Sequence, residues 1–304
     1  MSHSIKSIRR QFKDRGVFYT SPRLAELLKS FMPENIADVY DPTCGDGALL
    51  SVFSDDVMKY GQEIDSEQAE VARQRLCNNC IITGDTLGEL AFEPGSFRAI
   101  VANPPFSIPW DDAAHKTDVR FTDAPVLPPK ARADYAFLLH VIYMLADNGV
   151  AAVLNFPGIL YRGNREGKIR QWIVERNLIA EVMQIEGGYF EDTTISTALL
   201  IIKKNKTSTD IKFTDHALGI SRTVPIDEVK ANGFNLSVSS YVQAPEPEKI
   251  PFDVHEKEMA ARAHAIKTIK AEIEFSQMVA EFEGWSINDF IFDIITLASS
   301  YLKK

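Results

Sequence analysis

Asn103, Pro104, Pro105 and Phe106 follow directly on a short apolar run. A proline has no backbone N–H and a fixed φ, so two in succession end a strand and do not begin an ordinary helix. The amide oxygen of Asn103 and the carbonyl of Pro104 can accept hydrogen bonds, and the ring of Phe106 can stack on a flat partner. This set of groups suits a planar ring that carries an exocyclic amine.

A second group of candidate residues begins at Asp41, in the sequence Asp-Pro-Thr-Cys-Gly-Asp-Gly. Gly45 and Gly47 allow a tight turn and the close approach of a ligand. Glu63 follows about twenty residues later, where an acidic residue in nucleotide-binding α/β folds binds ribose hydroxyls. Asp85 ends the next predicted strand and could accept from the amine of an adenine. Together these acids predict a nucleoside-binding site.

The charge of this site indicates which nucleoside it suits. The glycine spacing does not match the dinucleotide fingerprint, and the acidic Asp41 beside the turn disfavours a pyrophosphate. An acid at that place suits a cationic cofactor such as S-adenosylmethionine, whose amino group and sulfonium are positive. We therefore predict S-adenosylmethionine and methyl transfer. The alternative is that these acids are only polar strand ends.

Short apolar segments alternate with segments of helical periodicity along most of the chain. The predicted strands are 37–40, 57–63, 80–84, 97–102, 150–156, 179–185 and 196–202. The predicted helices are 23–31, with Ser21 as N-cap, 46–53, 66–76, 133–146 and 166–175. This alternation predicts a doubly wound, Rossmann-like α/β domain with a parallel sheet covered on both faces.

Residues 106–131 interrupt this alternation, because they are rich in proline and lack periodicity. A connection of this length inside a compact domain is usually functional or disordered. We expect a loop beside the substrate site, in which Lys116, Arg120, Lys130 and Arg132 could contact phosphate. A solvated loop is the alternative. His115 and His140 lack partner spacing for a general base, and we interpret them as loop and helix residues.

The composition is that of a globular protein, with 304 residues, 45% hydrophobic residues and a net charge of −9. This charge gives no general positive field, so nucleic-acid binding would depend on local patches such as the basic arm 1–15. Three cysteines without a secretory signal or a long apolar run predict a cytoplasmic protein without a membrane segment. Cys77 and Cys80 lack a second ligand pair, so we predict no metal site.

Further motifs accompany these residues in a fixed order. Gly-Val-Phe-Tyr-Thr ends at Thr20, Asp-Tyr-Ala-Phe spans 134–137, Leu-Tyr-Arg-Gly spans 160–163 and Gly-Phe-Asn-Leu spans 233–236. With the segments at Asp41 and Asn103, they give a chain that resembles the N6-adenine DNA methyltransferases. It is most similar to the modification subunits of type I restriction-modification systems. The resemblance covers residues 16–242 and implies a methyltransferase fold.

The resemblance implies a set of cofactor contacts. These are Phe18, Tyr19, Thr20, Asp41, Thr43, Gly45, Gly47, Glu63 and Asp85. Asp41 would bind the amino group of S-adenosylmethionine, Glu63 the ribose hydroxyls and Asp85 the adenine amine.

The resemblance also implies how the substrate is held. The catalytic set would be Asn103, Pro104, Pro105 and Phe106, and the further substrate contacts would be Arg162 and Phe190. The target adenine would be flipped out of double-stranded DNA, because its amine cannot reach a protein cleft from inside the duplex. Phe190 would form the opposite wall of the base pocket, although an ordinary core aromatic is an equal alternative. No covalent nucleophile is required.

Two departures from the family concern the delivery of DNA. Type I modification subunits usually carry a helical domain before Gly-x-Phe-Tyr-Thr, whereas here only the short basic arm precedes that stretch. In addition, no target-recognition domain is evident here. The expected organisation is a basic arm 1–15, a catalytic domain 16–243, a proline-rich linker 244–254 and a helical tail 255–304. In the tail we expect a long helix 256–282 and a second, apolar helix after a capping box at 286–289.

The apolar face of the tail needs a partner surface, either the catalytic domain or a separate specificity subunit. We expect a specificity subunit to supply part of the sequence specificity, and a restriction subunit could be a further partner. A compact orphan methyltransferase that acts outside such a system is another form of the same interpretation. A methyltransferase of protein glutamine or RNA bases, or a non-catalytic cofactor-binding scaffold, are the alternatives to it.

Overall fold

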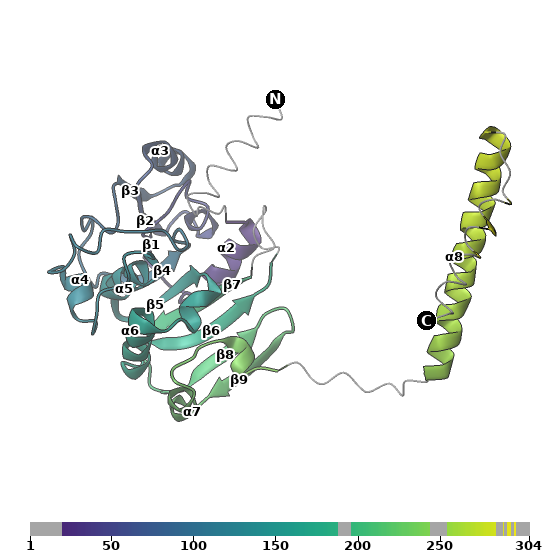
Figure 1. Ribbon diagram of the computed structural model, residues 1–304. Coiled ribbons are helices and arrows are strands. Elements are labelled where there is room, and N and C mark those ends of the chain that lie inside the picture. Colours follow the sequence, from purple (N-terminus) through teal and green to yellow (C-terminus); the bar gives the residue numbers. More distant parts are fainter. Residues whose placement is uncertain are drawn as a thin grey trace. The chain divides into compact units, whose positions relative to one another are not determined.

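The computed structural model of the protein describes residues 20–187, 196–243 and 254–283, together with Asn288, Ile291, Phe292 and Ile295 (Figure 1). The chain divides into two compact units between Ala244 and Pro245. The predictions for the basic arm, for Phe18, Tyr19 and Phe190, and for most of the proline-rich linker and of the second tail helix lie outside the described residues.

A nine-stranded sheet forms the centre of the first unit, in the order β3-β2-β1-β4-β5-β7-β6-β8-β9. The strands are β1 (Asp38–Asp41), β2 (Met58–Glu63), β3 (Asn79–Thr83), β4 (Phe97–Ala102), β5 (Leu145–Asn155), β6 (Ile179–Ile185), β7 (Thr197–Lys203), β8 (Ile211–Asp215) and β9 (Ile220–Val224). The strands β1 to β5 pair in parallel. Their carboxyl ends therefore lie at one edge.

The prediction of a wholly parallel sheet is wrong at β7 and β9. Strand β7 lies antiparallel between β5 and β6, and β9 is antiparallel to β8. The chain between β6 and β7 spans only residues 186–196, which is less than the dozen or more residues that a parallel crossover needs. The still shorter connection between β8 and β9 forces a hairpin for the same reason.

Helices cover both faces of this sheet, as predicted. Side chains of α2 (Pro22–Lys29) and α3 (Ser66–Arg75) belong to one buried cluster. Side chains of α5 (Asp134–Met144), α6 (Asn164–Glu175) and α7 (Ile226–Ala231) belong to the other. Along β5 the two clusters take alternate residues, because successive side chains of a strand point to opposite faces.

The structure confirms the helix predicted after Ser21 but contradicts the one predicted at 46–53. Ser21 caps α2, and its Oγ accepts from the N–H of Leu24 at 3.3 Å. The predicted helix 46–53 is wrong, because only the 3-10 turn η1 (Leu50–Val52) forms there. Gly45 and Gly47 have φ values of +53° and +83°, in the left-handed region that ends helical structure.

Short helical turns complete the first unit. They are α4 (Val119–Thr122), η2 (Pro157–Leu160) and η3 (Val238–Ser240). Of these, α4 lies within residues 106–131, which were expected to form a loop. That segment is therefore partly helical.

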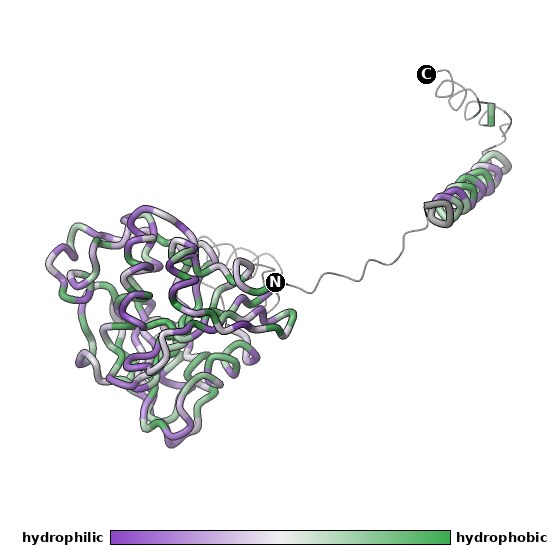
Figure 2. The backbone as a smooth tube through the Cα atoms, turned by 90° about the horizontal axis from the view of Figure 1, so that it is seen from below, coloured by the Kyte–Doolittle hydropathy of each residue, from purple (hydrophilic) through white to green (hydrophobic). Residues whose placement is uncertain are grey.

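The second unit contains α8 (Val254–Glu283), close to the predicted helix 256–282. Hydrophobic and hydrophilic stretches are mixed along this helix (Figure 2). Large apolar side chains remain between 48% and 67% exposed at Met259, Ile266, Ile269, Phe275 and Met278. Among the described residues, no helix has both the length and the apolar character that crossing a membrane requires.

Candidate functional site

A cavity of about 430 Å³ lies at the carboxyl ends of β1 to β4. It brings together eight of the predicted site residues. These are Thr20, Asp41, Thr43, Gly45, Glu63, Asp85, Asn103 and Pro105. The four strands are adjacent in the sheet, in the order β3-β2-β1-β4, so residues that are far apart in the sequence reach one site. The arrangement places the carboxyl groups of Asp41, Glu63 and Asp85 and the amide of Asn103 around a single ligand-sized space.

Asp41 is the most deeply buried acid of this cavity, with 1% of its surface exposed. Its Oδ1 accepts from the N–H of Thr43 at 2.9 Å. Burial raises the pKa of Asp41 to about 8, against the opposing effect of the Thr43 hydrogen bond and with a further increase from the nearby charge of Glu63. A positive ligand group beside this carboxyl would favour its ionised form, so the site suits a cation.

Glu63 organises the glycine turn. Its Oε2 accepts from the N–H of Gly45 and its Oε1 from the N–H of Asp65, both at 2.9 Å. A Cβ at Gly45 would meet no atom within 4 Å, so the left-handed φ, and not space, makes glycine suitable there. Gly47 does not line the cavity, and a Cβ at that position would lie 2.9 Å from the side chain of Leu76.

Asn103 follows the last residue of β4 and faces the cavity from its other side. Its Nδ2 donates to Thr20 Oγ1 at 3.1 Å, which orients the amide. Pro105 also lines the cavity, whereas Pro104 is buried and does not. Phe106 is 8% exposed, and its ring centroid lies 6.4 Å from that of Phe156. Its predicted role in stacking therefore stays a prediction.

Arg162 is not among the residues that line the cavity. Its Nη1 is 3.5 Å from Oε1 of the buried Glu166. Nearby, Asp134 is also buried, and its Oδ1 accepts from the N–H of Ser107, directly after Phe106. Burial raises the pKa of both carboxyl groups, against the opposing charge of Arg162. A contact of Arg162 with substrate stays a prediction.

Sequence reasoning expected a loop beside the substrate site at residues 106–131, but it did not predict that residues 108–122 form a wall of this cavity. Ile108, Trp110 and His115 line it, although this segment was expected to bind phosphate. Arg120 in particular is 4% exposed and bonded to backbone carbonyls, so the prediction that it contacts phosphate is wrong. The available signal was its position between the apolar Val119 and Phe121, two residues after the helix cap Asp118.

Comparison with known families shows what kind of chain has this site. The model of the N-6 DNA Methylase family matches residues 6–221. This match covers more than half of the sequence and includes every described residue predicted to contact cofactor or substrate. The chain belongs to this family.

Similar proteins carry related names. A type I restriction enzyme MpnII methylase subunit from Mycoplasma pneumoniae is 32% identical over 80% of this chain and 55% of its own length. The MjaIX methylase subunit from Methanocaldococcus jannaschii is 26% identical over the same shares. The chain thus spans about half the length of the curated relatives that it matches.

A solved structure supports the same fold. The type I restriction-modification methyltransferase subunit from Streptococcus thermophilus aligns with a TM-score of 0.68 and 30% identity, over 74% of this chain and 59% of that chain. The described fold is therefore similar to that of a methyltransferase subunit, and the methyltransferase fold that the resemblance implied is confirmed.

Proposed function

We propose that the protein transfers a methyl group from S-adenosylmethionine to the N6 amine of an adenine in double-stranded DNA. It would act as the modification subunit of a type I-like restriction-modification system. The observation that carries this proposal is the cavity in which Asp41, Glu63 and Asp85 face the same space as Asn103. Membership of the N-6 DNA Methylase family supports the choice of base and atom.

The residues present fit S-adenosylmethionine. A volume of about 430 Å³ suits a ligand of this size. The buried Asp41, whose pKa burial raises to about 8, would gain from a cationic amino group beside it. Glu63 would accept from ribose hydroxyls and Asp85 from the adenine amine. When bound, the cofactor supplies an electrophilic methyl group on a sulfonium.

The chain's own contribution is to hold the target amine. The amide of Asn103, oriented by its bond to Thr20, and the carbonyl of Pro104 would accept from the two N–H bonds of N6. Accepting both hydrogens favours tetrahedral geometry at nitrogen and directs its lone pair toward the cofactor side of the cavity. Positioning of this kind can supply several kcal/mol of the barrier reduction.

Transfer of a labelled methyl group tests this function. The chain is incubated with tritiated S-adenosylmethionine and unmethylated DNA, alone and with a specificity subunit from its host. We expect label in N6-methyladenine in at least one condition. Label in protein or RNA with none in DNA would refute the proposal in favour of a glutamine or RNA methyltransferase. Cofactor binding without any transfer would support the scaffold alternative.

We infer that the exposed apolar face of α8 docks on a specificity subunit. Ile266, Ile269 and Ile273 lie on one face of this helix over about two turns, and Ile266 is 67% exposed. The double change Ile266→Asp and Ile269→Asp should abolish co-purification with that subunit, whereas Thr268→Asp on the opposite face should not. Equal retention by both variants would remove the proposed interface.

We also infer that the enzyme works in the cytoplasm. Its cysteines, Cys44, Cys77 and Cys80, are free thiols, which suits a reducing compartment. Loss of activity on mild oxidation, restored by a reductant, would support this inference. Stable intramolecular disulfides in the protein purified from its host would contradict it.

A further inference from the structure

The wall formed by residues 108–122 is fixed to the backbone next to Asp85. Arg120 donates from Nη1 to the carbonyl of Thr86 at 2.7 Å and from Nη2 to those of Leu87 and Gly88, at 2.8 and 2.9 Å. One buried guanidinium thus binds three consecutive carbonyls that follow Asp85 in the chain. The wall therefore cannot move without disturbing the loop that carries the acid.

The charge of Arg120 is compensated inside this wall. Both oxygens of Asp118 lie 3.0 Å from its Nε. Although partial burial alone would raise the pKa of Asp118, hydrogen bonds from Arg120 and His115 lower it to about 2. The Nδ1 of His140 faces the guanidinium of Arg120, and its Nε2 faces the hydroxyl of Tyr40. Burial lowers the pKa of His140 to about 3, and the charge of Arg120 lowers it further. At neutral pH, Arg120 and Asp118 therefore form an ion pair, and the neighbouring His140 is neutral.

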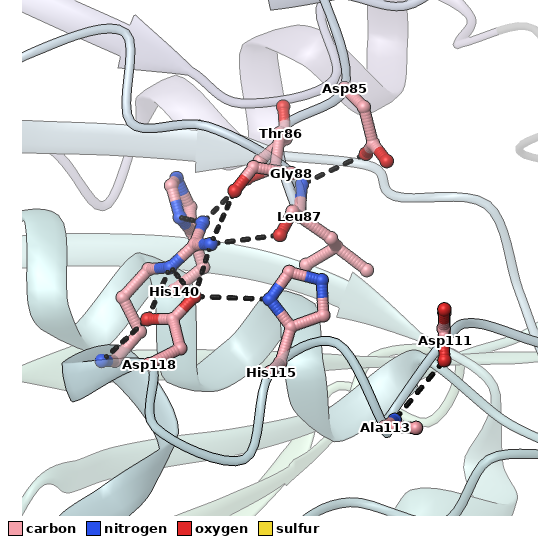
Figure 3. A network of polar contacts seen from close by, with 10 residues as sticks. Asp85, Thr86, Leu87, Gly88, Asp111, Ala113, His115, Asp118 and His140 are labelled. Carbon is pink, nitrogen blue, oxygen red and sulfur yellow. Dashed lines mark hydrogen bonds and ion pairs between the residues drawn. The ribbon is translucent and has the colours of Figure 1, made fainter.

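Asp118 also orients His115 (Figure 3). Nδ1 of His115 is 3.1 Å from Asp118 Oδ2. Because Asp118 is ionised, it favours the His115 tautomer that carries its hydrogen on Nδ1, and in that tautomer Nε2 is an acceptor. The ring stacks on Trp110 at a centroid distance of 5.3 Å and meets the edge of Phe121 at 5.7 Å. Its orientation is therefore fixed by a carboxylate and two aromatic rings.

His115 and Asp85 line the same cavity, on either side of Leu87 in the view of Figure 3. Asp85 already accepts the N–H of Leu87 with Oδ1 at 2.9 Å. Oδ2 of Asp85 and Nε2 of His115 are thus two acceptors beside one ligand space. An exocyclic amine offers two N–H bonds, so it can satisfy both of them.

We propose that His115 makes the site selective for a cofactor whose base is adenine. Its Nε2 would accept one hydrogen bond from the exocyclic amine of the adenine, and Asp85 would accept the second hydrogen bond from the same amine. Asp118 and Arg120 act as positioning residues for this contact. The inference rests on the proposed function, because it assumes an S-adenosyl ligand in the cavity. A nucleoside with an oxygen in place of the amine would set acceptor against acceptor and bind more weakly.

Binding of two product analogues tests the proposal. S-adenosylhomocysteine carries the amine, and S-inosylhomocysteine carries an oxygen in its place. The variant His115→Phe keeps an aromatic ring against Trp110 and removes Nε2. In calorimetry we expect its Kd for the adenosyl compound to rise about tenfold, the value of one hydrogen bond. Its Kd for the inosyl compound should stay the same or fall, so the preference for adenine drops at least tenfold.

Two further variants keep this test decisive. His115→Gln retains an acceptor oxygen and should recover part of the preference, whereas His264→Phe in α8 should leave both constants unchanged. A rise of both constants by the same factor in His115→Phe would show a structural role and overturn the proposal, as would no change in either. Because the readout is a ratio on one protein sample, partial unfolding cannot imitate the expected result.

The same measurement separates this inference from the proposed function. If the unchanged protein binds neither analogue, the cofactor assignment itself fails. If it binds both analogues equally well, the amine contacts assigned to His115 and Asp85 fail, whereas the assignment of the cavity to the cofactor stands. Transfer to DNA is measured independently of either constant.

Discussion

The cavity has two sides that are built in different ways. On the acid-bearing side, Asp41, Glu63 and Asp85 each accept the N–H of the residue two positions further along the chain, at 2.9 Å in all three cases. On the amide-bearing side, Asn103 is oriented by Thr20, which lies 83 positions away in the sequence. The first side is built locally, at each strand end, whereas the second depends on tertiary structure.

This difference separates binding from chemistry. An acid held by its own turn is in place before any ligand arrives, so its removal should weaken cofactor binding and also loosen the turn. Asn103 is oriented by the distant Thr20 and presents its amide to the target amine, so its removal should leave cofactor binding intact and affect the reaction. Substitutions on the two sides can confirm or break this distinction.

Asn103→Ala should have the largest effect. Loss of a positioned acceptor for the reacting amine should lower kcat for DNA methylation by about 10²- to 10³-fold, a typical cost of removing one transition-state hydrogen bond. The Kd for S-adenosylhomocysteine should change by less than about twofold. Single-turnover methylation and calorimetry measure the two quantities. Thr20→Val removes only the hydroxyl that orients Asn103, so it should give an intermediate loss of kcat. If Asn103→Ala weakened cofactor binding as much as it lowered kcat, the distinction between the two sides would fail.

Asp41→Asn should weaken cofactor binding by about a hundredfold, because it removes the buried partner of a cationic group. Without the ligand, the variant should be more stable at pH 8, with a Tm higher by about 2–4 °C for each kcal/mol gained, since the amide has no buried charge to desolvate. Asp46→Asn is the matched control, because Asp46 also lines the cavity but is paired with Arg75 at 2.8 Å. A similar loss in both variants would mean that general negative charge, and not Asp41, binds the ligand.

Glu63→Gln should raise the Kd by about thirtyfold, in the range expected for hydrogen bonds to a charged acceptor. The carboxylate accepts two backbone N–H groups, at Gly45 and Asp65, and an amide can accept at only one of its ends. Gln62→Glu adds a negative charge at a neighbouring lining residue and should not raise the Kd in the same way. Adenine and homocysteine lack the ribose, so Glu63→Gln should bind each of them as the unchanged protein does if the lost contacts are those to the ribose.

Local sequence was sufficient to predict the acid-bearing side. Each acid ends or closely follows a predicted strand, and parallel strands bring their carboxyl ends to one edge, so Asp41, Glu63 and Asp85 could be grouped without a structure. The same reasoning located Asn103, because two prolines must end β4. The helix predicted at 46–53 failed where two left-handed glycines turn the chain.

The wall at residues 108–122 could not be predicted in this way. Its function depends on Arg120 reaching the carbonyls of Thr86 and Leu87, more than thirty positions earlier, and no periodicity encodes such a contact. A basic residue in a proline-rich segment is more often a solvated side chain than a buried one. Likewise, the antiparallel β7 follows from the length of a connection and not from the residues of the strand itself.

The pH dependence of cofactor binding should be the smallest of these effects, and it tests the role of Asp41 most directly. Burial raises the pKa of Asp41 to about 8 in the free protein, so its carboxyl is largely protonated at pH 6 and about half ionised at pH 8. A bound cationic amino group lowers that pKa, so the complex holds fewer protons than the free protein and binding strengthens as the pH rises. The Kd for S-adenosylhomocysteine should fall by about tenfold between pH 6 and pH 8, with proton release visible as a buffer-dependent enthalpy. In Asp41→Asn the Kd should not vary over this range, whereas in Asn103→Ala it should vary as in the unchanged protein. A sloping profile in Asp41→Asn would assign the released proton to another group of the cavity.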